Sequence, residues 1–416
     1  MNVSCDLLPH DYLQAKFVLI SIVATVIGVF GVFGNLASIL VFTRPPMRTP
    51  NNLYLTVLAF FDTVLLVTAF LIYAMEYIIQ TFNSVTLYSV WLGYLRVTYA
   101  LSHVSQTGSV YTTVAVTIER YLAVLMPSKA RQACNTFGTV LSLLFVFCFA
   151  LLFNCSKFFE FSIQRNPSCA EGTFQAYVPV PSWLAQNSFY ATVYSLWLTN
   201  IVMLFLPFCV LLFFNSVIIV HMGRSHRHYL QQNTTVQDRR RSGAADVVGA
   251  ATAAVTAISK RHENRMKSRE ATVILVVMVS VFLVCNVWGF LLALAERVVG
   301  IRTLAQKNPT VYAFSRELIN FLAIVNSSIN FLIYCVFSRD FRAQATLVAC
   351  CGANVRVAMY DKFEFCRQIN ATLTQPVSLG RRPFLLKTAA SSETLRSYTY
   401  VTKFEHSPND VVESCV

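Results

Sequence analysis

The sequence is poor in charge. Only 13% of its 416 residues are Asp, Glu, Lys or Arg, whereas soluble domains carry about 25%. This shortage, together with a mean hydropathy of +0.54, excludes an ordinary soluble domain and favours a chain built for lipid. The sequence also lacks internal repeats and any block of soluble-domain composition, so we predict one membrane domain with flanking segments.

Motifs for catalysis and metal binding are missing too. No nucleophile and base form a recognisable set, and the 12 cysteines have none of the spacings of a metal site. Too few cysteines lie outside the apolar runs for a disulfide framework. We therefore expect neither an enzyme nor a cofactor. The net charge of +13 does not indicate nucleic acid, because the basic residues gather between the apolar runs and in the last part of the chain.

What the sequence does contain is seven apolar runs, each long enough to cross a bilayer as a helix of about 20 residues. They predict an all-α membrane protein with a seven-transmembrane helix bundle over residues 17–336. The absence of paired halves, broken helix pairs and filter-like loops argues against the rival prediction of a transporter or channel. The runs are Phe17–Thr43, Leu53–Gln80, Trp91–Leu125, Thr136–Phe159, Ser188–Val220, Ala271–Val298 and Val311–Val336.

The basic residues between the runs predict the orientation. The links after the first, third and fifth runs are rich in Lys and Arg, and the long link 221–270 carries the triplet Arg239–Arg241. Cytoplasmic loops have such an excess. We therefore expect a plasma-membrane protein with residues 1–16 outside the cell and residues 337–416 in the cytoplasm.

Features outside the runs predict modifications and partners. Asn2 begins a glycosylation sequon in the expected extracellular segment. Residues 339–348 place apolar side chains a few positions apart among basic ones, which predicts a short amphipathic eighth helix on the membrane lipid. Cys350 and Cys351 follow it and are candidates for palmitoylation, with two free thiols as the alternative. Ser414–Val416 matches the chain ends that PDZ proteins bind.

Polar side chains inside the runs predict a buried cluster. A carboxylate such as Asp62 must face the protein interior and find donors or a cation there. Asn326 and Asn330 are four residues apart and share a helix face. We expect Asp62 and a sodium ion to be solvated together by four residues, namely Ser109, Asn326, Ser327 and Asn330.

Short motifs along the apolar runs occur in the same order as in a known family of membrane proteins. Each expected helix carries one set of these residues, except the fourth, which lacks its marker. From Phe17 to Cys351 the chain therefore resembles a rhodopsin-like (class A) G-protein-coupled receptor. The sets are Gly34-Asn35, Leu58–Asp62, Glu119-Arg120-Tyr121, Pro207, Phe282–Cys285 and Asn330–Tyr334.

The resemblance implies how the chain signals. Glu119 would hold Arg120 at rest, and Arg120 would then meet a heterotrimeric G protein, with Tyr121 and Asn330 as further residues of this coupling group. Tyr334 would swing inward on activation. A polar switch that binds sodium at rest would be formed by Asn35, Asp62, Ser109, Asn326, Ser327 and Asn330. Phosphorylated Ser and Thr residues of the last segment would recruit arrestin.

Departures from the family matter as well. Phe331 stands where the family usually has proline, and Leu95 stands where it has an extracellular cysteine. The resemblance therefore leaves Cys169 without its usual partner. Cys5 is the expected partner, and Cys155 is the competitor.

Two positions exclude ligand classes that the family is known to bind. Ser102 lies where amine receptors of the family have an acid, and Ile324 lies where opsins have a lysine. The segments Val114–Val124, Asn154–Glu160 and Asn326–Phe331 are similar to those of invertebrate FMRFamide-type neuropeptide receptors. The resemblance implies an amidated peptide ligand, with a lipid or another small molecule as the alternative.

A peptide ending in Arg-Phe-amide needs an acid, aromatic surface and polar groups for its amide. We expect Glu160 and Glu171 to be solvated acids rather than ligand contacts. The candidates for ligand binding are Glu76, Ser102, His103, Gln106, Asn286, Phe290, Glu317 and Asn320.

Overall fold

The computed structural model of the chain describes Cys5, residues 12–241 and residues 251–350. Asn2, Cys351 and Ser414–Val416 lie outside the described residues. The chain divides into two compact units, Met1–Ala345 and Thr346–Val416. The sites described below all lie in the first unit.

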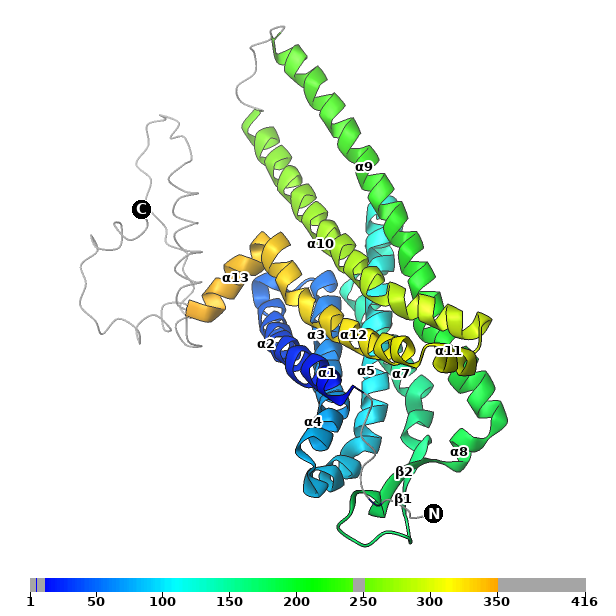
Figure 1. The fold of residues 1–416 in the computed structure, drawn as a ribbon. Coiled ribbons are helices and arrows are strands. Elements are labelled where there is room, and N and C mark those ends of the chain that lie inside the picture. The colour runs from blue at the N-terminus through cyan, green and yellow to red at the C-terminus, as the bar shows by residue number, and fades with distance from the viewer. Residues whose placement is uncertain (1–4, 6–11, 242–250, 351–416) are drawn as a thin grey trace, which may run out of the picture. The chain divides into compact units, whose positions relative to one another are not determined.

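Helices dominate the described chain (Figure 1). The α-helices are α1 (Leu13–Lys16), α2 (Thr25–Phe42), α3 (Pro50–Ala69), α4 (Met75–Phe82), α5 (Val85–Leu125), α6 (Pro127–Ala133), α7 (Thr136–Asn154), α8 (Trp183–Gln186), α9 (Leu206–Arg241), α10 (Ala251–Val298), α11 (Ile301–Lys307), α12 (Pro309–Phe337) and α13 (Arg339–Cys350). The 3₁₀ segments are η2 (Pro45–Met47), η4 (Cys155–Phe159) and η5 (Phe174–Ala176). The π-helical segments are η1 (Phe17–Ala24), η3 (Phe70–Ala74), η6 (Tyr190–Leu198) and η7 (Ile201–Phe205).

Six helical stretches of the described chain are long and apolar enough to cross a membrane. They agree with six of the seven expected runs. The stretches are Leu13–Phe42, Pro50–Phe82, Thr136–Phe159, Ile201–Arg224, Arg269–Glu296 and Pro309–Phe337.

The third expected run is a helix of 41 residues, α5, but it is not strongly apolar. Its buried side chains include Thr98, Ser105, Thr112 and Thr117. α5 packs against α3, α7 and α9, so much of its surface faces protein rather than lipid. Three of these hydroxyl groups donate to carbonyl groups one turn earlier, as Thr117 does to Thr113 O at 2.6 Å. Thr112 Oγ1 has no hydrogen-bond partner among the described residues.

The expected long loop 221–270 is largely helical instead. Helix α9 continues to Arg241, and α10 begins at Ala251. The link holds no proline and only three glycines, so few residues stop the helices that leave the fifth and sixth spans. The link between the fifth and sixth spans therefore consists largely of two helix extensions.

The π-helical segment η7 ends two residues before Pro207, which has no N–H to donate. A π-turn next to a proline leaves a carbonyl group that needs another donor. Tyr111 supplies it, because its hydroxyl donates to Val202 O at 2.9 Å. This bond ties α5 to the chain just before α9.

A short hairpin connects the fourth and fifth spans. Strands β1 (Phe161–Arg165) and β2 (Tyr177–Pro181) pair antiparallel, with Ile163 opposite Pro179. The loop between them carries Cys169, which forms a disulfide bond with Cys5. The predicted pairing is thus present, and Cys155 is a free thiol. We call the end of the bundle near β1 and β2 the hairpin end, and the opposite end the α13 end.

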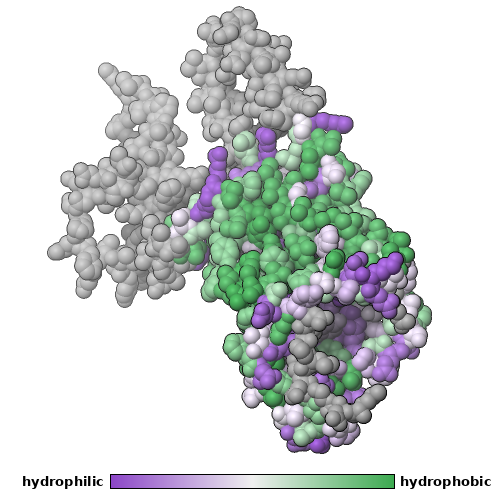
Figure 2. Space-filling model, viewed as in Figure 1, coloured by the Kyte–Doolittle hydropathy of each residue, from purple (hydrophilic) through white to green (hydrophobic). Residues whose placement is uncertain are grey.

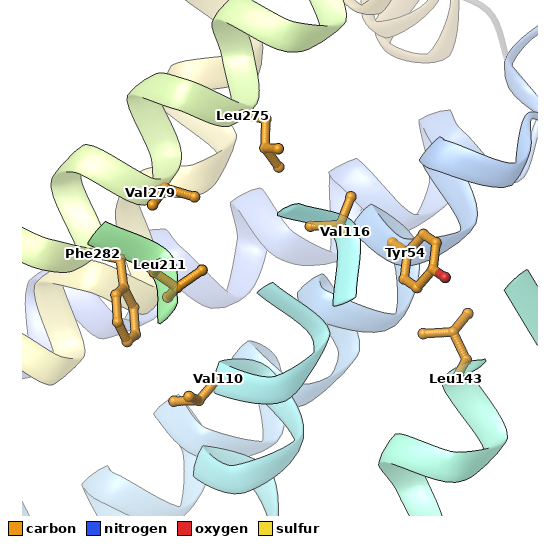
Figure 3. Packing of buried hydrophobic residues seen from close by; sticks show 8 residues of the cluster. All are labelled: Tyr54, Val110, Val116, Leu143, Leu211, Leu275, Val279 and Phe282. Atoms are coloured by element: carbon orange, nitrogen blue, oxygen red, sulfur yellow. The ribbon is translucent and has the colours of Figure 1, made fainter. Parts of the chain in front are cut away.

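Five helices meet in a buried cluster (Figure 3). Side chains from α3, α5, α7, α9 and α10 converge on Val116, which is fully buried. The cluster consists of Tyr54, Val110, Val116, Leu143, Leu211, Leu275, Val279 and Phe282.

The outer surface of the helices is apolar. Figure 2 shows hydrophobic residues over the visible flank of the bundle and hydrophilic residues around a hollow at the hairpin end. Phe33 and Phe145 are 68% and 70% exposed. Exposed apolar surface of this extent is unusual for a soluble monomer and suits contact with lipid tails.

Candidate functional site

A cavity of about 740 Å³ lies at the α13 end. The predicted pair Glu119 and Arg120 lines it. Arg120 Nη2 donates to Glu119 Oε1 at 3.0 Å, and the two side chains are only 12% and 6% exposed. Glu119 Oε2 has no hydrogen-bond partner among the described residues. The cavity is therefore lined by a mostly buried guanidinium group, and the carboxylate that pairs with it belongs to the neighbouring residue on the same helix.

Tyr334 lines the same cavity. Its ring packs against Phe42 and Phe341, with centroids 5.1 and 5.5 Å apart. Its hydroxyl has no hydrogen-bond partner in the described part of the chain. Tyr121 is placed differently, because it packs against Phe214 of α9 at 4.8 Å.

The predicted polar cluster forms around Asp62, which is fully buried. Ser109 Oγ donates to Asp62 Oδ1 at 2.7 Å, and Asn330 Nδ2 donates to Asp62 Oδ2 at 2.8 Å. Asn35 Nδ2 donates to the carbonyl oxygen of Ser327 at 2.9 Å. The cluster thus links α2, α3, α5 and α12 in the interior of the bundle.

Asn326 is the member of the predicted cluster that the structure does not join to Asp62. It is half-buried, and within the described ranges it shows no hydrogen bond to the carboxylate. It shares a helix face with Asn330, but a shared face does not bring both side chains to one oxygen atom.

A second cavity, of about 450 Å³, lies at the hairpin end. It is lined by residues of α4, α5, η6 and the hairpin, among them Trp91, Tyr99, Pro179 and two acids. The acids are Glu76 and Glu160. A cavity with aromatic walls and two carboxylates suits a ligand that has both an apolar group and a cation.

The environment of Glu160 differs from the one expected from the sequence. It was expected to be a solvated acid, but its side chain is only 13% exposed. Lys157 Nζ lies 2.5 Å from Glu160 Oε1, and the hydroxyl groups of Tyr99 and Tyr190 donate to the carboxylate at 3.2 and 2.9 Å. The adjacent apolar pair at 158–159 gave no signal of this burial, because Phe159 is itself 59% exposed.

Glu317 lies at the same end, on α12. Tyr77 donates its hydroxyl to Glu317 Oε1 at 2.5 Å, whereas Glu317 Oε2 is buried and has no hydrogen-bond partner among the described residues. Glu76 is close enough to Tyr77 to act on it electrostatically. The structure therefore brings the two predicted acids Glu76 and Glu317 to one tyrosine.

The other predicted ligand residues are not gathered around the 450 Å³ cavity. Ser102 is buried, Gln106 is exposed and Asn320 is half-buried. His103 packs its ring against Tyr99 at 4.7 Å. Asn286 and Phe290 lie on α10.

Their contacts on α10 are local or apolar. Asn286 Nδ2 donates to Phe282 O of its own helix at 2.8 Å. Phe290 packs between Phe205 and Phe208, at 5.0 and 4.7 Å. Both side chains therefore have structural contacts that explain them without a ligand.

The fourth span has a polar contact in place of its missing marker. Asn154 is 1% exposed, and its Nδ2 donates to Thr107 Oγ1 at 2.7 Å and to Ala150 O at 2.9 Å. Thr107 in turn donates to His103 O at 2.8 Å. These hydrogen bonds join α7 to α5 near the hairpin end of the bundle.

A seven-helix bundle with a buried polar core and a cavity at each end defines a multi-pass membrane receptor rather than an enzyme. The chain matches the family model "7 transmembrane receptor (rhodopsin family)" over residues 34–334. It belongs to this family.

Characterised relatives have modest similarity. The FMRFamide receptor of Drosophila melanogaster is 27% identical over 337 residues, which cover 79% of this chain and 53% of that receptor. The FMRFamide peptide receptor frpr-18 of Caenorhabditis elegans is 27% identical over 342 residues, which cover 81% and 71%. The thyrotropin-releasing hormone receptor of Homo sapiens is 33% identical over 148 residues, or 35% of each chain. The chain thus spans about half the length of the Drosophila receptor.

Proposed function

We propose that the protein is a plasma-membrane receptor for an extracellular amidated peptide and that it activates heterotrimeric G proteins. In this orientation residues 1–16 and the hairpin end face the outside, and residues 337–416 and the α13 end face the cytoplasm. The basic links after the first, third and fifth spans support this orientation, because cytoplasmic loops carry an excess of Lys and Arg.

The cavity at the α13 end carries the proposal. It is lined by a guanidinium group that is only 12% exposed and is paired with Glu119. A partner that accepts hydrogen bonds can take over Arg120, because bonds to a charged group are among the strongest in proteins. The basic surface of the neighbouring links is also suited to a membrane with anionic lipids.

The test replaces Arg120 by alanine. Peptide binding should persist, because Arg120 lies at the end opposite to the proposed ligand site, whereas nucleotide exchange on the G protein should be lost. Surface expression and radioligand binding report whether the variant folds. Normal exchange with Arg120→Ala would remove Arg120 from the mechanism.

Two observations support the proposed class of ligand, namely the names of the relatives and the environment of Glu317. The relatives' names specify FMRFamide, whose arginine needs an acid. Glu160 and Glu296 already have cations within 4.0 Å, namely Lys157 and Arg316. Glu317 instead offers a buried Oε2 without a hydrogen-bond partner in the described chain. We assign the arginine of the peptide to Glu317.

The matched variants are Glu317→Gln and Glu296→Gln. Glu317→Gln keeps an acceptor for Tyr77 and loses the charge, so the potency of FMRFamide should fall about tenfold to hundredfold. An analogue with citrulline in place of arginine should be far less affected, and Glu296→Gln should change neither peptide by much. Equal losses for both peptides would argue against an ionic contact. Calcium and cyclic-nucleotide assays over a panel of amidated peptides would identify the natural agonist.

The cluster at Asp62 fits a sodium ion in the resting state. Its oxygen atoms, which hard cations prefer as ligands, include the Asp62 carboxylate, the Ser109 hydroxyl and Asn35 Oδ1. Asn35 Oδ1 is buried and has no hydrogen-bond partner among the described residues. A sodium ion there would stabilise the charge of Asp62.

Further partners follow from the terminal segments. We propose glycosylation at Asn2 and palmitoylation at Cys350 and Cys351, with α13 lying on the membrane lipid. We also propose that the last segment binds arrestin, and that Ser414–Val416 binds a PDZ protein.

A further inference from the structure

Helix α10 is bonded to the corner between α12 and α13. Glu270 Oε1 accepts a hydrogen bond from the backbone N–H of Arg339 at 2.7 Å. Glu270 lines the same cavity as Arg120 and Tyr334. One side chain of α10 therefore joins two walls of the cavity that holds the guanidinium.

The first N–H groups of a helix explain why this bond forms. They have no partner within the helix, and the helix dipole favours a negative charge beside them. In α13 the side chain of Ser338 satisfies the N–H of Phe341 at 3.2 Å. The N–H of Arg339 remains, and the Glu270 carboxylate accepts it in a charge-assisted bond.

The corner that receives Glu270 is rigid. Phe341 is fully buried and packs against Phe42 and Tyr334. Arg342 Nη1 donates to the carbonyl groups of Cys335 and Val336 at 2.9 and 2.7 Å, at the end of α12. If the bond between Glu270 and Arg339 breaks, α10 is therefore the element that is free to move.

The ion pair of the cavity does not restrain α10 in the same way. Arg120 and Glu119 are neighbours on α5, so their bond holds the guanidinium but joins no second helix. Restraint of α10 at this end requires a different residue.

Resting on the proposed function, we propose that Glu270 is the residue that keeps the receptor inactive without ligand. The bond from Arg339 N–H to Glu270 Oε1, the Glu270 latch, holds α10 against the α12–α13 corner and keeps the cavity too narrow for the G protein. Breaking the latch shifts the population from the closed to the open cavity. Glu270 acts through the position of α10 and need not touch the partner.

The expected shift is about tenfold in the ratio of closed to open receptor, which corresponds to about 1.4 kcal/mol. Because the open form is the minor one at rest, basal activity should rise by nearly the same factor. Activity at saturating peptide should change little, since the open form already dominates there.

The chain offers a matched pair of variants at the donor. Arg339→Pro removes the N–H, and Arg339→Ala keeps it and removes only the exposed side chain. Proline is well tolerated at the first position of a helix. Ser338 has φ −105° and ψ 116°, an extended conformation that suits the residue before a proline.

The assay measures basal GTPγS binding by heterotrimeric G protein with the purified full-length receptor in lipid nanodiscs. Glu270→Ala and Arg339→Pro should each raise basal exchange about tenfold, and Arg339→Ala should leave it unchanged. The double variant Glu270→Ala/Arg339→Pro should equal either single variant, because both remove one interaction. FMRFamide-stimulated exchange should persist in all of them.

Two results would overturn the latch while leaving the proposed function intact. One is equal basal exchange in Arg339→Pro and Arg339→Ala with a normal response to peptide. The other is additive effects in the double variant, which would mean that Glu270 and Arg339 act separately. If neither the unmodified receptor nor any variant drives exchange with a panel of amidated peptides, the proposed function fails as well.

Discussion

Alanine at Gly34 is a substitution whose cost the structure defines closely. A Cβ atom there would lie 2.7 Å from Phe331 Cβ and 2.9 Å from Phe331 Cγ. Because Cβ is bound directly to the backbone of α12, rotation of the phenyl ring cannot relieve this contact, and the two helices must move apart. Gly28, on the same helix, is a matched control, since its Cβ would lie at an ordinary distance of 3.8 Å from Ile324.

The magnitude follows from two opposing terms. Replacing a glycine by alanine inside a helix gains about 1 kcal/mol, and overpacking a well-packed contact costs about 1–3 kcal/mol. Gly28→Ala should therefore be neutral or stabilising, and Gly34→Ala neutral to destabilising. The two variants should differ by about 1–3 kcal/mol. In domains of 150–250 residues 1 kcal/mol shifts the melting temperature by about 2–4 °C, so we expect a difference of several degrees.

Thermal unfolding of both variants in lipid nanodiscs measures this difference. The two must be heated at the same rate, because unfolding of large proteins is often irreversible and the midpoint then depends on the scan. A Gly34→Ala receptor that melts with or above Gly28→Ala would refute the close approach of α2 and α12. The same displacement should weaken the bond from Asn330, the residue before Phe331, to Asp62.

Three further predictions concern single bonds. Cys5→Ser and Cys169→Ser should lower thermal stability equally, and the double variant should be no worse, because both remove one disulfide. Asn154→Ala should lower stability by about 0.6–1.7 kcal/mol in the same melting assay, since it removes an interhelical bond to Thr107. Tyr334→Phe should leave the melting temperature unchanged, because the hydroxyl has no hydrogen-bond partner in the described chain, yet lower peptide-stimulated exchange if that hydroxyl is used in the active state.

The sequence was sufficient to predict those polar residues whose environment follows from their position along a membrane span. Asp62 had to face the interior because a carboxylate cannot face lipid, and the structure gives it two donors. Arg120 was recognisable because a charged pair ends the third span. Spacing along a helix fixes the direction of such side chains, so little else was needed.

Partners across long sequence distances were not predictable in the same way. The donor to Glu270 is a backbone N–H 69 residues away, and no side-chain pattern marks it. The burial of Glu160 depends on how the hairpin folds back on Tyr99 and Tyr190, which composition does not encode. The sequence analysis treated α5 as an apolar span and did not predict its many buried hydroxyl groups. A run of apolar residues does not reveal which helix of a bundle is surrounded by the other helices.

The geometry of α5 and α12 argues that the two cavities work as one device. Tyr99 at the hairpin cavity and Arg120 at the α13 cavity are 21 residues apart on α5, which at about 1.5 Å per residue is about 32 Å. That length matches the hydrocarbon core of a bilayer, about 30 Å, and Ser109, bonded to Asp62, lies midway. On α12, Glu317 and Tyr334 lie 17 residues apart, or about 26 Å, and Asn330, which is bonded to Asp62, lies one turn before Tyr334. A ligand that pulls on either helix at one face therefore acts on the Asp62 cluster and on the opposite cavity through rigid elements, with no further relay required.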